Sequence, residues 1–189
     1  NLQMGYYPGT TACEGVSQPN YNCNGCPTKE YGRVGSLALI KTTYVETVMA
    51  NPSLDATWVT MLSSGNGFTI PQTTGSYDGG STEEQPGFGR QVTTNGNTTH
   101  TIVYKDPNYS ENCDFYNALR NSTDYTLAYV TGSKVHFAIA PVTFTPRNPV
   151  SDDIKSFVTW EITAKWISED SPCPYDIPPT MLTTCNIAR

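Results

Sequence analysis

The segment IKSFVTWEITAKW, residues 154–166, constrains the fold of this chain more than any other stretch. Six of its seven apolar positions share one parity, and its Lys, Glu and Thr positions take the other. Alternation with a period of two is typical of a β-strand with one buried and one wet face. At about 3.3 Å per residue the strand would be roughly 40 Å long, enough to span a sandwich or barrel. The expected buried side chains are Ile154, Val158, Trp160, Ile162, Ala164 and Trp166.

Other segments also favour strands over helices. The run RVGSLALIK, 33–41, has apolar residues on both parities, which indicates a strand covered on both faces. Composition agrees, because 12 Tyr, 15 Gly and 14 Pro with only 15% charged residues suit strands and turns. We expect further strands at 98–105, 124–130 and 134–145, and short ones in ATWVTML, 56–62, and GFTIP, 67–71.

One segment is predicted to be helical, about residues 109–120. Asn108 or Ser110 can cap it, and Phe115 and Leu119 lie four residues apart on one face. The fold class predicted is therefore mainly β, an antiparallel β-sandwich or barrel with one short α-helix and extended arms. Its expected core includes Trp160, Ile162, Trp166, Phe115 and Leu119.

The chain divides into three parts. Residues 1–30 form a Cys-rich N-terminal arm, 31–167 a β domain, and 168–189 a Pro-rich C-terminal arm. Within the domain, residues 72–90 are expected to be a long Gly-rich loop, and such loops usually serve binding or assembly. The candidate assembly residues in this loop are Tyr77, Asp78, Glu83, Glu84 and Phe88.

The cysteines admit more than one interpretation. Five of the six lie in the two arms, so disulfides within or between subunits could tie the arms together, or the thiols could stay free. A zinc site would need a fourth ligand from Cys113, Cys173 or Cys185, because CNGC has no second paired knuckle. We favour a structural role. The cysteines concerned are Cys13, Cys23, Cys26, Cys173 and Cys185.

No catalytic or cofactor motif is present in the sequence. His100 and His136 fall in expected strands without a partner at catalytic or metal-ligand spacing, so we expect neither an enzyme nor a cofactor. The net charge of −6 offers no basic surplus for tight nucleic-acid binding. No apolar run of 18 residues predicts a transmembrane helix, and no signal peptide is visible, so no membrane partner is expected.

The order of these segments resembles the tail-tube, or major tail, proteins of tailed bacteriophages. The resemblance covers about residues 31–167 and rests on the loop SYDGGSTEEQPGFG, the helix NCDFYNALR, the hairpin around YVTGSKVHF and the strand DDIKSFVTWEITAKW. The arm leading into EYGRVGSLALIK is also similar to virion-type proteins of phages that infect gut bacteria.

This resemblance implies a virion structural protein whose copies close into six-membered rings. The rings would stack through the arm and the long loop, with other virion proteins as further partners and DNA passing through without specific binding. The Cys-rich arm departs from the family pattern, which leaves a capsid decoration, fibre or connector protein open. A secreted β-sandwich adhesin or carbohydrate-binding module is the alternative from another class, with Tyr77 and Phe88 stacking on sugar.

Overall fold

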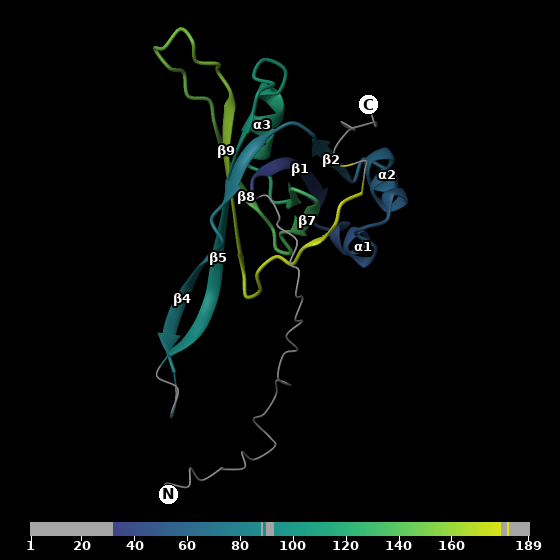
Figure 1. The fold of residues 1–189 in the computed structure, drawn as a ribbon, viewed down its shortest axis with the longest axis vertical. Coiled ribbons are helices and arrows are strands. Elements are labelled where there is room, and N and C mark those ends of the chain that lie inside the picture. The colour runs from purple at the N-terminus through teal and green to yellow at the C-terminus, as the bar shows by residue number, and fades with distance from the viewer. Residues whose placement is uncertain (1–31, 88, 90–92, 179–180, 182–189) are drawn as a thin grey trace, which may run out of the picture.

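The computed structural model describes residues 32–87, 89, 93–178 and 181, and these form an antiparallel sheet with three short helices (Figure 1). The sheet order is β10-β7-β6-β1-β3-β5-β9-β8, with β2 paired to β1 and β4 paired to β5. The predicted mainly-β fold is confirmed. The strands are β1 (Val34–Lys41), β2 (Gly67–Ile70), β3 (Thr74–Tyr77), β4 (Ser81–Pro86), β5 (Thr93–Asp106), β6 (Tyr125–Thr131), β7 (Lys134–Phe137), β8 (Thr143–Arg147), β9 (Trp160–Ser168) and β10 (Tyr175–Asp176).

The sheet curls around its main core. Tyr129 on β6 and Trp166 on β9 lie four strands apart in the sheet order, yet both rings pack against Tyr77 of β3, with centroids 5.3 Å and 6.0 Å away. This curvature places the inner faces of distant strands in one hydrophobic cluster. The cluster contains Trp160, Ile162, Trp166 and Leu119, as predicted, whereas Phe115 is only partly buried against it.

The first strand is covered on both faces, as its two apolar parities predict. Leu37 and Leu39 join the inner core, and Ala38 and Ile40 join a second cluster on the outer face. Two helices, α1 (Val45–Ala50) and α2 (Asp55–Ser63), cover that second cluster. Strand β1 is thus enclosed between the inner core and the two helices (Figure 1).

The strand predicted at 56–62 is wrong, because this segment is helix α2. Its buried residues Trp58, Met61 and Leu62 have helical spacing. The helix ends in a Schellman motif, in which Asn66 N donates to Met61 O and Gly65 N to Leu62 O. Gly65 has a φ of 67°, a left-handed conformation that glycine adopts without strain. The segment SSGNG, 63–67, is therefore the end of a helix and the start of β2.

The predicted helix at 109–120 is present in shorter form as α3 (Cys113–Leu119). Neither Asn108 nor Ser110 caps it, because the N-cap residue is Asn112. The Asn112 side chain donates to Asp106 of β5 instead of capping the helix. Tertiary contact with the sheet has thus replaced local capping at this helix.

The long strand predicted at 154–167 is half wrong. Strand β9 begins at Trp160, and its buried residues have the expected parity. Residues 148–159 instead form an exposed loop in which Ile154 is 98% exposed. The cause is the lack of neighbours, because β5 ends at Asp106 opposite Trp160 and β8 ends at Arg147 opposite Glu161. Beyond these pairs no strand offers hydrogen-bond partners, so the alternation cannot form sheet.

Two further segments differ from the expectations. The supposed loop 72–90 contains β3 and β4, which both pair with β5. The strand predicted at 134–145 is broken after Phe137, where the chain leaves β7 and re-enters the sheet as β8 beside β9. The hairpin of β6 and β7 around the turn at 132–133 is confirmed.

Candidate assembly surface

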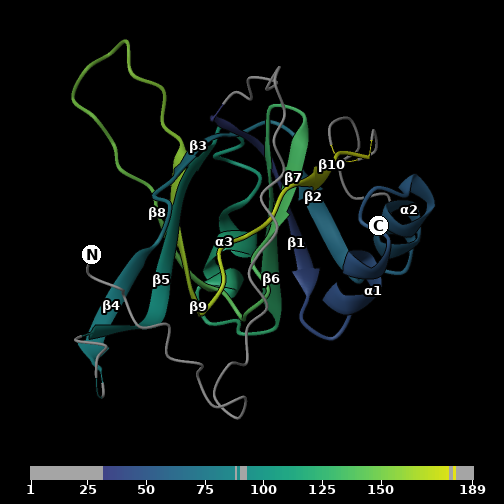
Figure 2. The same ribbon diagram turned by 60° about the horizontal axis from the view of Figure 1, so that its bottom comes forward.

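The loop at 148–159 carries the most exposed large apolar side chains of the described residues. Val150, Ile154 and Phe157 are 73%, 98% and 92% exposed. The loop projects beyond the body of the molecule (Figures 1 and 2), and its N-terminal end lies near the segments that flank α3. Its base is tied to that region, because Arg120 Nη2 donates to Pro146 O at 2.8 Å and Asn148 Nδ2 to the Tyr109 hydroxyl at 3.4 Å. Exposure of several large apolar groups in one segment marks an interaction site.

The tip of this loop is an ordered turn. Asp153 N donates to Ser151 Oγ at 3.1 Å, Lys155 N to Asp153 Oδ1 at 3.0 Å, and Ser156 N to Asp153 O at 2.9 Å. These bonds hold Ile154 and Phe157 on a defined backbone, so fewer conformations have to be lost when the tip is bound.

A second projecting element is the hairpin of β4 and β5, at the opposite end of the molecule from the loop (Figures 1 and 2). All six residues of β4 are exposed, and among the described residues β4 pairs only with β5. Its second edge therefore offers unpaired backbone groups to another chain. Glu83 and Glu84 lie on this strand, and both are exposed. Their role in assembly stays a prediction.

Tyr77 does not belong to an exposed loop, whereas Asp78 is exposed in the turn between β3 and β4. The Tyr77 ring is partly buried and packs against Trp166, Tyr129 and His100. Since this ring is part of the core, it is not available to stack on a sugar. The segment predicted as the loop 72–90 therefore contributes a side chain to the core. Phe88, the other aromatic predicted to bind sugar, lies outside the described residues.

Asp78 organises the turn between β3 and β4. Partial burial acts to raise the pKa of Asp78, but the N–H groups of Thr101 and Gly80 donate to its carboxylate and hold the pKa below its usual range. Gly80 has a φ of 85°, and a Cβ there would lie 2.7 Å from Nδ1 of His100. The turn thus needs both the carboxylate and the glycine.

The hydrogen bonds of His100 define its protonation. The Ser168 hydroxyl donates to Asp170 O at 2.7 Å, so it accepts from His100 Nε2, 3.0 Å away. Nδ1 then accepts from the Tyr77 hydroxyl at 2.7 Å. Burial lowers the pKa of His100, although the negative charge of Asp78 acts to raise it. The lowered pKa favours the neutral form of the ring. Because His100 Nε2 donates to the Ser168 hydroxyl, it is not arranged to remove the proton of that hydroxyl. The contacts of His100 are therefore those of a structural residue.

His136 lies on β7 and stacks on Tyr129 with centroids 4.9 Å apart. Burial lowers its pKa, and Pro172 O near Nδ1 opposes that effect. Both histidines are thus strand residues, as expected.

A pocket of about 510 Å³ opens beside α3. Its aromatic wall is formed by Phe68, Phe115 and Tyr125, which are all partly buried. The Phe68 ring contacts Phe115 and Tyr125 edge-on, with centroids 4.9 Å and 5.7 Å away. Glu111, exposed, and Asp106, buried, add carboxylates to the lining. This aromatic pocket is within the size range of roughly 300–1,000 Å³ in which proteins bind ligands.

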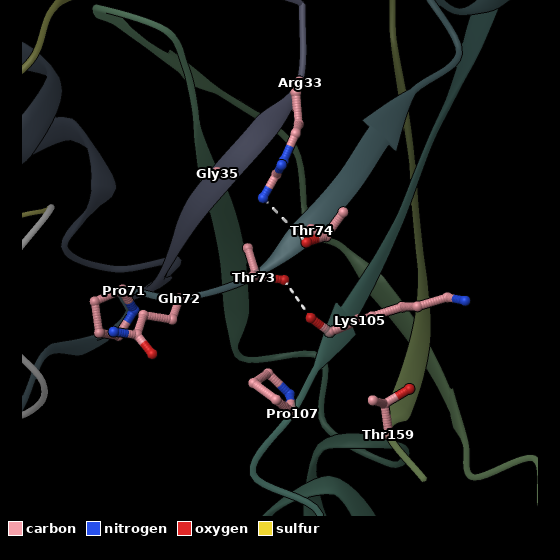
Figure 3. A pocket seen from close by; sticks show the side chains of 9 residues that line it. All are labelled: Arg33, Gly35, Pro71, Gln72, Thr73, Thr74, Lys105, Pro107 and Thr159. Carbon is pink, nitrogen blue, oxygen red and sulfur yellow. Dashed lines mark hydrogen bonds between the residues drawn. The ribbon is translucent and has the colours of Figure 1, made fainter. Parts of the chain in front are cut away.

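A second pocket of about 540 Å³ shares Pro71 with the aromatic pocket (Figure 3). Arg33 and Lys105 line it, and neither forms an ion pair within the described part of the chain. Arg33 Nη2 donates to Thr74 Oγ1 at 3.2 Å, and Thr73 Oγ1 donates to Lys105 O at 2.6 Å (Figure 3). This cationic pocket leaves two positive charges available to an acidic partner.

The cysteines predicted to be structural are only partly covered by the structure. Cys13, Cys23, Cys26 and Cys185 lie outside the described residues. Cys173 and Cys113 are exposed free thiols, and no disulfide joins them to each other in the described part of the chain. A bond from Cys173 to a neighbouring subunit stays a prediction. Within residues 32–87, 89, 93–178 and 181 no cluster of His, Cys, Asp and Glu could hold a metal.

Comparisons with known proteins give no family assignment. No family model, no curated protein and no solved structure matches the chain. In the described part of the chain, no helix is long and apolar enough to cross a membrane.

Proposed function

We propose that this protein is a structural subunit that assembles with copies of itself, and that the assembly is the tail tube of a bacteriophage virion. The observation that carries the proposal is the loop at 148–159, because three large apolar side chains stand in solvent on it, with Ile154 held on an ordered turn. Contact with another chain would bury them and recover about 25 cal/mol for each Å² of apolar surface.

The placement of the two projecting elements adds support. The loop and the hairpin of β4 and β5 extend from opposite ends of the molecule (Figures 1 and 2). A subunit with contact elements at both ends can join neighbours head to tail, and such contacts give rings or open stacks. Pairing of the free β4 edge in an assembly would also remove an aggregation liability.

The acidic balance fits a tube that conducts DNA. The net charge is −6, and Glu83 and Glu84 are exposed on β4. Carboxylates that face a bore repel phosphates, so the wall would not retain the polymer that slides through it. In this role the subunit does not bind DNA specifically, because the DNA only passes through the tube. The assembled tube would be part of a virion.

Sedimentation velocity of the full chain, combined with electron microscopy, tests the proposal. We expect rings or stacked tubes that form with increasing concentration. A chain that remains monomeric up to millimolar concentration contradicts self-assembly. Assemblies without a central channel would contradict the tube and leave a decoration, fibre or connector protein as the virion role.

A carbohydrate-binding module is the second candidate, and the aromatic pocket is the observation that favours it. Three partly buried rings beside Asn108, Asn112 and Glu111 combine an apolar surface with polar groups, the usual composition of ligand pockets. This function predicts a monomer that binds glycans, with binding lost in Phe115→Ala.

A further inference from the structure

We propose that the loop at 148–159 of one copy docks into the aromatic pocket of the next copy, and that its acidic residues pair with the adjacent cationic pocket. The inference rests on the proposed self-assembly and names the two surfaces that would meet. Each surface stays open in the single chain, because Ile154 and Phe157 are almost fully exposed and the aromatic pocket is empty of described residues.

The first argument is apolar complementarity. The loop presents Ile154 and Phe157 three residues apart on an ordered turn. The pocket presents a wall of Phe68, Phe115 and Tyr125 and a volume of about 510 Å³. A Phe ring entering it would find aromatic edges and faces at the distances that such pairs favour, centroids about 4.5–7 Å apart. Aromatic side chains buried in a pocket are the groups that contribute most to the binding energy of an interface, so we expect the Phe157 ring to be the main anchor.

The second argument is charge complementarity. Asp152 and Asp153 directly precede Ile154, and all three are exposed. Arg33 and Lys105 line the cationic pocket, which adjoins the aromatic pocket at Pro71. The loop thus presents two acids before Ile154 and a single cation, Lys155, after it, so the segment 152–155 keeps a net negative charge. The receptor presents Arg33 and Lys105 next to the aromatic wall, with Glu111 at the edge of that wall. Attraction between the loop carboxylates and these two cations would orient the docked loop.

The third argument is position. The base of the loop contacts Tyr109 and Arg120, which flank α3, and the aromatic pocket is lined by Glu111, Asn112 and Phe115 at the start of the same helix region. Loop and pocket therefore lie at the same end of the molecule. Docking between copies would be a side-by-side contact, in which one subunit's loop reaches its neighbour at the same level. Because loop and pocket are different surfaces, the contact is heterologous and can close a ring.

The first experiment compares two apolar-to-polar variants of the full chain by sedimentation. Phe157→Ser removes the proposed anchor, and we expect self-association to weaken roughly tenfold or more. Val59→Ser is the matched control, because Val59 is 40% exposed on α2, on the other side of the molecule from the loop (Figures 1 and 2). The control should associate like the unchanged chain. Equal association of both variants overturns the docking proposal.

The second experiment reverses the charges. Arg33→Glu/Lys105→Glu should repel the acidic loop of the next copy, and Asp152→Lys should repel the unchanged cationic pocket. Each variant alone is expected to associate at least tenfold more weakly. Mixed together they should co-assemble in alternation, because each loop then meets a receptor of opposite charge. Failure of the mixture to recover association, with both variants folded by circular dichroism, overturns the pairing.

These outcomes separate the two proposals. If the unchanged chain does not self-associate, the proposed function fails together with the docking. If it assembles but Phe157→Ser assembles equally well, only the docking is wrong. A soluble glycan that fills the pocket without changing assembly would likewise assign the pocket to another occupant and overturn the docking.

Discussion

The hydroxyl of Tyr116 on α3 donates a 2.6 Å hydrogen bond to Oδ2 of Asp106 at the end of β5. Asp106 is 1% exposed, and no described cation pairs with it. Its carboxylate is satisfied by Asn108 N, Asn112 Nδ2 and Tyr116, all of which donate. This buried acceptor fixes α3 on the sheet beside the aromatic pocket.

Removal of the Tyr116 hydroxyl therefore should destabilise the protein. In Tyr116→Phe the Asp106 carboxylate keeps two donors but loses the third, and we expect a cost of about 1–3 kcal/mol in the free energy of unfolding. Urea denaturation measures the change. Tyr109→Phe is the matched control, since its hydroxyl only accepts a 3.4 Å bond from exposed Asn148. Equal stability of the two variants would contradict the role of the Asp106 network.

Trp160 marks the point where the sheet begins and the projecting loop ends. Its side chain is 3% exposed, its Nε1 donates to Tyr109 O at 2.9 Å, and its ring packs 5.0 Å from Tyr116. We expect Trp160→Ala to cost about 3–5 kcal/mol. Phe157→Ala, three positions earlier and 92% exposed, should change the unfolding free energy by less than about 0.5 kcal/mol. Similar costs in a denaturant series would mean that the loop packs on the body.

Stability should fall in mild acid because of His100. Burial lowers its pKa in the folded state, whereas the unfolded chain has the ordinary value of about 6.5. As the pH falls through about 6.5, His100 takes up a proton in the unfolded chain before it does so in the folded protein. The free energy of unfolding therefore decreases from its value at pH 7.5, and the decrease ends once the folded His100 is also protonated. The lowered pKa of His136 adds to the same trend.

The midpoint of urea unfolding, measured from pH 7.5 to 5, tests this titration. His100→Gln keeps one donor and one acceptor in the ring's place, so it should flatten the pH dependence even if it lowers stability at every pH. An unchanged slope in this variant would show that His100 does not titrate between the two states.

Cys113 and Cys173 should react with a thiol reagent in the folded protein, because both are exposed free thiols in the described part of the chain. Alkylation under native conditions followed by peptide mapping gives the extent at each site, with a denatured sample as the reference. We expect full labelling of both in dilute protein. Labelling of Cys113 with protection of Cys173 that is reversed by a reductant would indicate a disulfide between subunits at Cys173.

The local alternation of apolar and polar residues was enough to predict much of the fold from the sequence. The parity of Trp160, Ile162 and Trp166 predicted one buried face of β9, and the two-sided run at 33–41 predicted the doubly covered β1. Period-two burial is a property of the strand itself, so no knowledge of distant contacts is needed to read it. Gly65 after Leu62 is also a signal readable from sequence, because glycine commonly follows the last turn of a helix.

Only the tertiary structure decided where that alternation stops and what it leaves exposed. Ile154 and Val158 continue the parity of β9, but a strand needs neighbours for its backbone groups, and β5 and β8 end at Asp106 and Arg147. Ile154, which the sequence places in the core, therefore stands in solvent on the projecting loop, and Val158 is only partly buried. The aromatic and cationic pockets also depend on tertiary contact, because β2, β5, α3 and β6 meet only when the sheet curls.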